Sequence, residues 1–361
     1  MSVSAGRGRL TQNEIARMAG VSQTTVSLVL NNRCEAAWRI APETRERVLR
    51  VIRETGYVAD PLARRLLQQH NQILGVFTYE SVFPSTSGNF YHPFLSGIEA
   101  CAESIGCDLL LFTSAPVSGG SRRIFHDNNR IRLADGCVLL GREIPPDELA
   151  RMVAEDMPFV SVGRRDDAYL PSGKGGPVPH VGADYAQATA ALVHRAVDLG
   201  HRVMAYVGAG AGPESAVDRL AGFTAAVRET GVDGRHEPVG GRTRAELLDV
   251  LCSARVTAVF CEELVEAAAM AEAARARGLS VPGDLSLLAL GDPTEQAETD
   301  LDLTGFRIPR EDMGWQAIEV LDDILHGRIS DHQRLLPCEL VEGETLGAPG
   351  PAGLRWLASG G

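Results

Sequence analysis

With 361 residues, of which 44% are hydrophobic and 23% charged, the chain has the composition of a globular protein with more than one domain. No apolar run reaches the roughly 20 residues of a membrane-spanning helix, and residues 1–10 lack the apolar stretch of a secretory signal, so we expect a cytoplasmic protein without membrane contact. The net charge of −12 is uneven: residues 1–70 contain 11 arginines and 6 acidic residues, against 24 basic and 41 acidic residues in the rest, and a basic head favours a nucleic-acid contact at that end.

The first seventy residues favour short helices. Thr11 and Ser22 have the hydroxyl side chains that are preferred just before a helix, and Gly20 suits the end of the helix between them. A third helix is expected after Pro42 and a short fourth near Pro61, because proline is favoured in the first helical turn.

The most specific stretch covers residues 10–32, LTQNEIARMAGVSQTTVSLVLNN, and predicts a helix, a tight turn and a second helix. In a helix-turn-helix the second helix enters the major groove, where its N-terminal side chains reach base edges. Val26, Val29 and Leu30 have the spacing of an inward helical face. The side chains left outside are Gln23, Thr24, Ser27 and Leu28.

This stretch resembles the head of the lactose-repressor (LacI/GalR) family, whose usual form is DVA-x-x-AGVS-x-x-TVS-x-VLN. The similarity continues through residues 43–48, 56–57 and 61–66. Several fixed spacings agree in order, which makes a chance coincidence of helices improbable.

The resemblance implies roles for the second helix. Gln23 and Thr24 would be the main base-reading pair. Leu28 stands where the family commonly has a base-contacting arginine, so guanine readout is lost there and contact with a thymine methyl becomes possible. Side chains near phosphates would be Thr25, Ser27 and Asn31.

The resemblance also implies a hinge at residues 59–70. Residues 61–67 would form a helix that orders on specific DNA and lies in the minor groove. Leu66 would be the apolar wedge that partly opens a central base step, with Arg64 and Arg65 on the phosphates beside it.

From residue 73 onward, apolar strands alternate with amphipathic helices, which predicts parallel sheets covered by helices on both faces. Two doubly wound sheets with a cleft between them suit this length. The Pro/Gly-rich segment 170–179 is a candidate crossing between the lobes. The expected strands are 73–79, 109–113, 137–140, 159–163, 203–208, 258–261 and 285–290, and the expected helices are 185–199, 216–230, 244–255 and 265–277.

Residues 88–99, 134–140, 181–184 and 218–223 are similar to the same family's ligand-binding core, which itself resembles periplasmic sugar-binding proteins. The fold expected is therefore α/β, with an all-α helix-turn-helix head and a two-lobed, doubly wound sensor core. The expected domains are a DNA-binding head at 1–58, a hinge at 59–70, an effector-binding and dimerisation core at 71–345, and a disordered tail at 346–361.

By resemblance, effector contacts would come from Phe90 and Tyr91 in the first lobe and from Ser215 and Arg219 in the second. Aromatic rings stack on a ligand ring, and an arginine gives fixed, charge-assisted hydrogen bonds to oxygen atoms. The alternative for these aromatic residues and for Arg219 is simple core packing. Further candidate contacts are Arg242, Glu263 and Asp292.

The pocket departs from the usual sugar site. Gly291 replaces an acid that commonly binds sugar hydroxyls, and Glu262 and Glu263 replace an Asn-Asp pair. The loss of an acid, together with positive charge at Arg219 and Arg242, favours an anionic effector such as a sugar phosphate or acid. A neutral sugar, or no effector at all, are the alternatives.

The function expected is that of a sequence-specific DNA-binding transcriptional regulator, a repressor by family habit, that binds pseudo-palindromic operator DNA as a homodimer. A small molecule between the lobes would control it. The alternatives are a ligand-independent DNA-binding dimer and a solute-binding protein, which the basic head disfavours.

We expect no enzyme, cofactor or metal site. The glycine-rich residues 208–212 miss the G-x-G-x-x-G spacing, and neither a nucleophile elbow nor a P-loop is present. The seven cysteines lack C-x-x-C spacing.

Overall fold

The computed structural model describes residues 10–31, 40–55, 57, 71–80, 88–118, 121–127, 129–292 and 300–350. The chain divides into two compact units, Met1–Asn71 and Gln72–Gly361. In the described ranges no helix is both long and apolar enough to cross a membrane.

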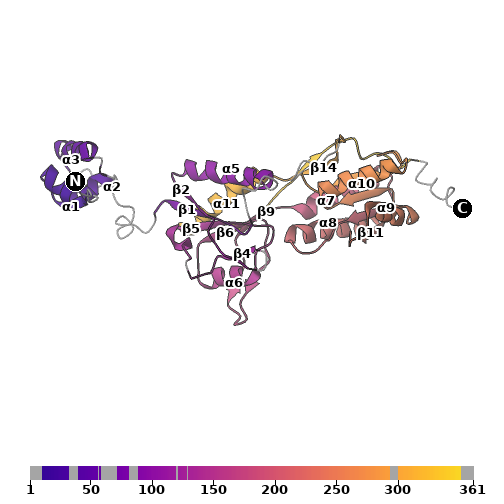
Figure 1. Ribbon diagram of the computed structural model, residues 1–361, viewed down its shortest axis with the longest axis horizontal. Helices are drawn as coiled ribbons and strands as arrows, with labels where there is room; N and C mark the ends of the chain where they lie inside the picture. The colour runs from indigo at the N-terminus through magenta and orange to yellow at the C-terminus, as the bar shows by residue number, and fades with distance from the viewer. Residues whose placement is uncertain are drawn as a thin grey trace, which may run out of the picture. The chain divides into compact units, whose positions relative to one another are not determined.

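Three helices form the head unit: α1 (Gln12–Ala19), α2 (Gln23–Asn31) and α3 (Pro42–Thr55) (Figure 1). The Thr11 hydroxyl accepts a hydrogen bond from the Glu14 amide, and the Glu14 carboxylate accepts one from the Thr11 amide at 2.7 Å. α1 ends at Gly20, whose left-handed backbone (φ 65°) suits glycine. The predicted ends of the first helix are confirmed.

The head has its own small core. Ile15, Val26 and Val48, one from each helix, are fully buried and pack together. Leu30 packs against them, so the inward face predicted for α2 is confirmed. The Ser22 hydroxyl accepts from the Thr25 amide at 3.2 Å and begins α2 as expected.

The first lobe of the larger unit contains a six-stranded parallel sheet in the order β15-β9-β6-β5-β1-β2. Helices α5 (Gly88–Ser104) and α11 (Arg310–Leu325) lie side by side against one face, and α6 (Pro146–Ala154) covers the other (Figure 1). The strands are β1 (Ile73–Thr78), β2 (Asp108–Phe112), β5 (Gly136–Leu140), β6 (Phe159–Val162), β9 (His180–Ala183) and β15 (Gln333–Leu336).

The second lobe contains a sheet in the order β11-β10-β12-β13-β14-β16, parallel except for β16. Helices α7 (Tyr185–Asp198) and α8 (Glu214–Thr230) cover one face, and α9 (Arg244–Ser253) and α10 (Leu264–Ala276) cover the other. The strands are β10 (Val203–Val207), β11 (Asp233–Glu237), β12 (Ala258–Cys261), β13 (Ser286–Ala289), β14 (Thr304–Arg307) and β16 (Glu339–Val341).

The short elements all belong to the first lobe. They are β3 (Val117–Ser118), β4 (Ser121–Arg122), η2 (Ile131–Leu133), β7 (Ala168–Tyr169) and β8 (Gly175–Gly176). β7 and β8 form a hairpin that packs against α6.

Glycines let the two main helix pairs approach closely. A Cβ atom on Gly97 of α5 would overlap the carbonyl oxygen of Glu311 in α11. A Cβ on Gly222 of α8 would likewise overlap the carbonyl oxygen of Ala186 in α7. Each lobe therefore has one helix pair that packs backbone against backbone.

The chain crosses between the lobes three times: after β9, between β14 and α11, and between β15 and β16. The segment 170–179, predicted to be a crossing, instead belongs to the β7–β8 hairpin of the first lobe. Its proline and glycine residues make a turn, and the chain returns to the first sheet as β9 before it crosses.

The second lobe extends beyond residue 345, where the sequence predicted a disordered tail to begin. The Gly347 amide donates to the Ser286 hydroxyl at 3.2 Å, and the Gly347 carbonyl oxygen lies 2.8 Å from His201 Nε2. Leu346 packs against the apolar core. The expected tail from 351 onward lies outside the described residues.

Candidate DNA-reading helix and effector cleft

The side chains on the outward face of α2 are uncharged and mostly polar. Gln23 and Thr24 are exposed in the first turn, and the Gln23 side-chain amide donates to Gln12 Oε1 at 3.3 Å. Leu28 and Ser27 are half-buried beside them. This surface can approach a base edge without a repelling carboxylate.

The other predicted DNA contacts are placed only in part. Thr25 is half-buried, and its hydroxyl lies 2.9 Å from that of Ser22. Asn31 ends α2, but its side chain is not described, and the hinge residues Arg64, Arg65 and Leu66 lie outside the described residues.

A cavity of about 380 Å³ lies between the two lobes of the core. That volume suits a small organic ligand. The structure brings six of the predicted effector residues to its wall: Phe90, Tyr91, Ser215, Arg219, Glu263 and Asp292.

Arg242, the seventh predicted contact, is not among the residues that line this cavity. Gly240 and Gly241 both have positive φ and turn the chain just before it. Its guanidinium folds back on its own loop, 3.1 Å from Glu237 Oε2, and donates to the Pro238 carbonyl oxygen. The expected contribution of Arg242 to an anion site is therefore corrected.

On the first lobe, Tyr91 and Phe90 form an edge-to-face pair with ring centroids 4.9 Å apart. Tyr91 is 3% exposed, and its hydroxyl donates to Glu80 Oε2 at 2.7 Å. Burial, together with the Glu80 carboxylate, raises the pKa of Tyr91. Tyr91 is thus a fixed part of the wall, while the half-buried Phe90 has more exposed ring surface.

On the second lobe, Arg219 is held in one orientation. Its Nε donates to the Leu290 carbonyl oxygen at 2.6 Å, and Nη1 donates to the Ser215 carbonyl oxygen at 2.9 Å. The guanidinium carbon lies 4.0 Å above the centre of the Tyr185 ring. The backbone of Ser215 therefore helps to fix the Arg219 guanidinium, and Ser215 also lines the cavity.

Sequence reasoning missed Arg310, which is 7% exposed and lies beside the same wall. Its Nη2 is 3.7 Å from Asp292 Oδ2, and its guanidinium carbon is 5.1 Å from the centre of the Phe90 ring. Burial raises the pKa of Asp292 and lowers that of Arg310. A signal was present in the sequence: a cation directly after Pro309, at the positive end of a helix, opposes the helix dipole.

Comparison with known protein families gives one match in each unit. The family described as "Bacterial regulatory proteins, lacI family" matches residues 11–60, and the family described as "Periplasmic binding protein-like domain" matches residues 193–346. The HTH-type transcriptional repressor CytR of Escherichia coli (strain K12) is 28% identical over 354 residues, which cover 94% of this chain and 97% of CytR. The chain is thus similar to the lacI family in its head and to a transcriptional repressor over nearly its whole length.

Other transcriptional regulators are similar over nearly the same length. The HTH-type transcriptional regulator CelR of Thermobifida fusca is 28% identical over 347 residues, covering 91% of this chain and 96% of CelR. A crystal structure of the lac repressor dimer bound to operator and the anti-inducer ONPF matches with a TM-score of 0.69 and 20% identity, covering 94% of this chain and all of that chain. The protein is thus a DNA-binding regulator with a ligand-binding core.

Among the described residues, four ion pairs join the lobes. Each takes its arginine from the first lobe and its carboxylate from the second. The pairs are Arg142–Glu263 at 2.7 Å, Arg164–Asp218 at 2.7 Å, Arg165–Glu214 at 2.6 Å and Arg310–Asp292 at 3.7 Å.

The third of these pairs is largely buried. The Arg165 side chain is 3% exposed and also donates to the carbonyl oxygens of Gly141 and Arg142 and to the Ser161 hydroxyl. Because all of those partners are in the first lobe, Arg165 is anchored there and offers Glu214 a fixed docking point. No spacing of residues along the chain predicts these pairs.

Proposed function

We propose that the protein is a transcriptional repressor whose homodimer binds a pseudo-palindromic operator, and whose operator affinity is set by a small molecule in the interlobe cleft. The observation that carries this is the joining, in one chain, of an exposed polar reading helix to a two-lobed core with an arginine-lined cavity. CytR, a relative over nearly the whole chain, is a transcriptional repressor by name.

On DNA, we assign base reading to Gln23 and Thr24, with the methyl groups of Leu28 available to a thymine methyl. Thr25, Ser27 and Asn31 would lie near phosphates. In the hinge, Leu66 would enter the minor groove as an apolar wedge. Arg64 and Arg65 would contact the phosphates beside it.

Dimerisation is supported by the edges of the two sheets. β2 forms one edge of the first sheet and has the sequence Asp-Leu-Leu-Leu-Phe, with Leu109 37% exposed and Ile105 nearby 38% exposed. β11 forms an edge of the second sheet and is exposed but charged, Asp-Gly-Arg-His-Glu. Charged edges resist pairing, whereas an apolar edge favours it, so we propose that a second copy packs at β2.

The test is a selection of bound duplexes from a random DNA pool with the full-length protein, repeated with candidate metabolites. We expect enrichment of an inverted repeat whose half-sites lie about one helical turn apart. Affinity for it should fall steeply as salt rises, because phosphate contacts release counterions. A purified dimer that enriches no sequence would overturn the proposal, as would an operator affinity that no metabolite changes.

A further inference from the structure

A bridge between the lobes lies at the end of the cavity where strands β1, β5 and β12 finish. The Arg142 amide donates to Glu80 Oε1 at 2.9 Å, and the Arg142 guanidinium donates to Glu263 Oε1 at 2.7 Å. Glu80 follows β1 in the first lobe, and Glu262 lies directly before Glu263, after β12 in the second lobe. All four residues line the cavity. Glu80 and Glu262 therefore lie on facing lobes at the same end of the cavity, the bridge end.

Glu262 is held in one position but keeps an oxygen atom for a ligand. Its Oε2 accepts from the Tyr206 hydroxyl and from the Gly210 amide, each at 2.8 Å. Its side chain also packs so close to Gly208 that a Cβ atom there would overlap it. No hydrogen bond to Oε1 is found within the part of the chain that the structure describes, so this oxygen can accept from a bound molecule.

The negative charges of Glu80 and Glu262 are not balanced by ion pairs. Both side chains are half-buried, and no ion pair in the described ranges includes either carboxylate. Arg142 beside them is paired with Glu263. Arg122 donates to the Glu80 carbonyl oxygen at 3.1 Å but does not line the cavity. Two like charges in a half-buried cleft disfavour each other, so a cation that enters the cleft would stabilise them.

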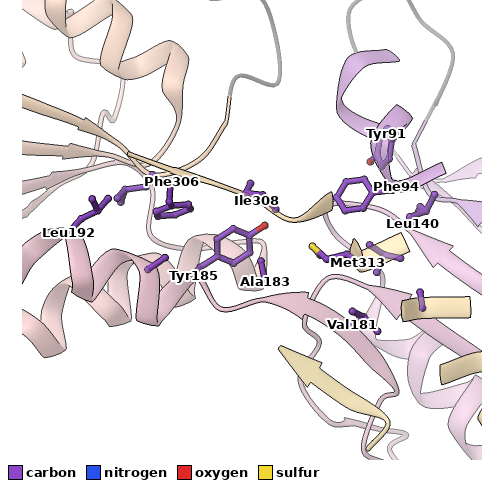
Figure 2. Packing of buried hydrophobic residues seen from close by; sticks show 14 of the residues in the cluster. Tyr91, Phe94, Leu140, Val181, Ala183, Tyr185, Leu192, Phe306, Ile308 and Met313 are labelled. Atoms are coloured by element: carbon purple, nitrogen blue, oxygen red, sulfur yellow. The ribbon is translucent and has the colours of Figure 1, made fainter. Parts of the chain in front are cut away.

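The arginines on the cavity wall have partners of their own. Three of them pair with carboxylates of the second lobe: Arg142, Arg164 and Arg165. Arg219 stacks on the Tyr185 ring and donates to two backbone carbonyl oxygens. Figure 2 shows Tyr185 well apart from Tyr91, whose hydroxyl donates to Glu80. The wall of the cavity thus has no arginine left to pair with Glu80.

A protonated amine has the chemistry that the bridge end can bind. An ammonium group has three N–H donors on one atom, enough to reach two carboxylates and a further acceptor. A metal ion is less suited, because the described residues include no group of three or more His, Cys, Asp or Glu side chains that could hold one. Instead of the anion that the sequence predicts, we propose that the effector carries a protonated amino group that binds between Glu80 and Glu262. The effector class is thus a small amine, and this inference rests on the proposed role of the cleft as the effector site.

The test uses the full-length protein and two matched pairs of ligands: glucosamine against N-acetylglucosamine, and putrescine against 1,4-butanediol. In each pair only the first member carries a positive charge near neutral pH. Binding is measured by calorimetry at constant ionic strength, with magnesium chloride as a further probe. We expect at least one amine to bind, and its uncharged counterpart to bind at least about tenfold more weakly, because charge-assisted hydrogen bonds to carboxylates are lost.

Two results would overturn the inference at this stage. One is that neither amine binds more tightly than its uncharged counterpart. The other is that magnesium binds while both amines do not, which would assign the bridge end to a metal ion.

Glu262→Gln tests the site itself, because it removes the charge and keeps a side-chain oxygen for the Tyr206 and Gly210 donors. We expect it to weaken binding of the preferred amine about tenfold and to leave the uncharged counterpart unchanged. Glu229→Gln is the matched control: Glu229 is exposed near the end of α8, pairs with His194 and does not line the cavity. It should bind the amine like the wild type.

Glu80→Gln, on the facing lobe, is a second variant that should show the same selective loss. Without ligand, the melting temperature of Glu262→Gln should be unchanged or higher, since one of two facing like charges is gone. Unchanged amine affinity in both variants would overturn the inference. An equal loss for the amine and its uncharged counterpart would do so too, because it would mean that the carboxylates only shape the wall.

Failure of the inference and failure of the proposed function give different results. If an uncharged ligand releases the operator equally from wild type and Glu262→Gln while no amine is preferred, effector control stands and the amine site is wrong. If an amine binds through Glu262 but no ligand changes operator affinity, the amine site stands and effector control is wrong.

Discussion

Gln23 illustrates how one side chain can be prepared for base reading before DNA arrives. It is exposed at the start of α2, and Gln12 of α1 accepts a hydrogen bond from its amide nitrogen. A glutamine amide held in this way can pair with the N6 and N7 atoms of adenine. Its neighbours on the helix are small and uncharged, so the amide is the main polar group at this position.

We predict that Gln23→Ala weakens binding to the selected operator by about 1–3 kcal/mol and relaxes the preference at one base pair of each half-site. Binding to an unrelated duplex should hardly change. Fluorescence anisotropy on both duplexes measures this, with Arg53→Ala, exposed at the end of α3, as the control. An equal loss on both duplexes would mean that Gln23 contacts the backbone only.

At the same scale, the effector residues show what a sequence pattern can predict. Arg219 and Phe90 follow recognisable motifs, and both line the cavity, while their contact with an effector stays a prediction. Arg242 does not line it, because two positive-φ glycines redirect its loop, and such a turn cannot be predicted from residue types alone. Arg310 was missed because its significance depends on its burial and on its place beside Asp292 and the Phe90 ring, which only a three-dimensional structure reveals.

Among the elements, the α5–α11 pair sets the packing of the first lobe. Gly97→Ala would force a methyl group onto the Glu311 carbonyl oxygen, so the helices must separate. We predict a loss of about 3 kcal/mol in the free energy of unfolding, at the upper end of ordinary overpacking costs. Urea denaturation measures it, and Gly176→Ala, whose added Cβ would make only an ordinary contact with Val153, should cost far less.

The segment after β16 is anchored by a buried histidine. His201 is 1% exposed and lies 2.8 Å from both Thr257 Oγ1 and the Gly347 carbonyl oxygen. Burial lowers its pKa below the ordinary 6.5, so the folded state favours the neutral ring. The contribution of His201 to the free energy of unfolding is therefore complete above pH 6.5. It is lost as the pH falls from 6.5 toward the lower pKa of the folded state.

We predict that the melting temperature drops between pH 7 and pH 5, with His201 contributing at most about 2 kcal/mol by pH 5. His180 is also buried with a lowered pKa and adds a loss of the same sign. His201→Gln should flatten part of the pH profile measured by differential scanning calorimetry. A profile identical to that of the wild type would contradict the assignment.

For the whole molecule, the four lobe-spanning ion pairs hold the cleft in its observed width. Glu214→Gln removes the charge that meets the buried Arg165, at the cost of leaving that guanidinium uncompensated. We predict a loss of about 3 kcal/mol in stability, the lower end for a broken buried pair because Glu214 is partly exposed. We also expect a larger radius of gyration by small-angle X-ray scattering, as the lobes part.

Glu237→Gln is the matched control, because its partner Arg242 lies in the same lobe. It should leave the radius of gyration unchanged. A Glu214→Gln protein as compact as the wild type would show that apolar packing at the crossings, rather than the ion pairs, sets the closure.

The two-lobed architecture was predictable because strands such as β1, β5, β10 and β12 are apolar runs between amphipathic helices. The route between the lobes was not. β9 (His-Val-Gly-Ala) and β14 (Thr-Gly-Phe-Arg) are interrupted by glycine and polar residues, and β15 is half exposed, so they lack the apolar run of a clear strand pattern. The Pro/Gly-rich segment 170–179 gave a stronger signal but marks a hairpin inside one lobe.

The three crossings also set an order of completion during translation. The reading helix α2 and its supporting helices are finished at Thr55, long before β15 leaves the ribosome at Gln333–Leu336 to form one edge of the first sheet. α11, which covers that sheet, is likewise made after most of the second lobe. Translation of a truncated message that ends between these points yields a complete DNA-binding head attached to a core without a complete cleft. Such a product can contact DNA but cannot respond to a metabolite.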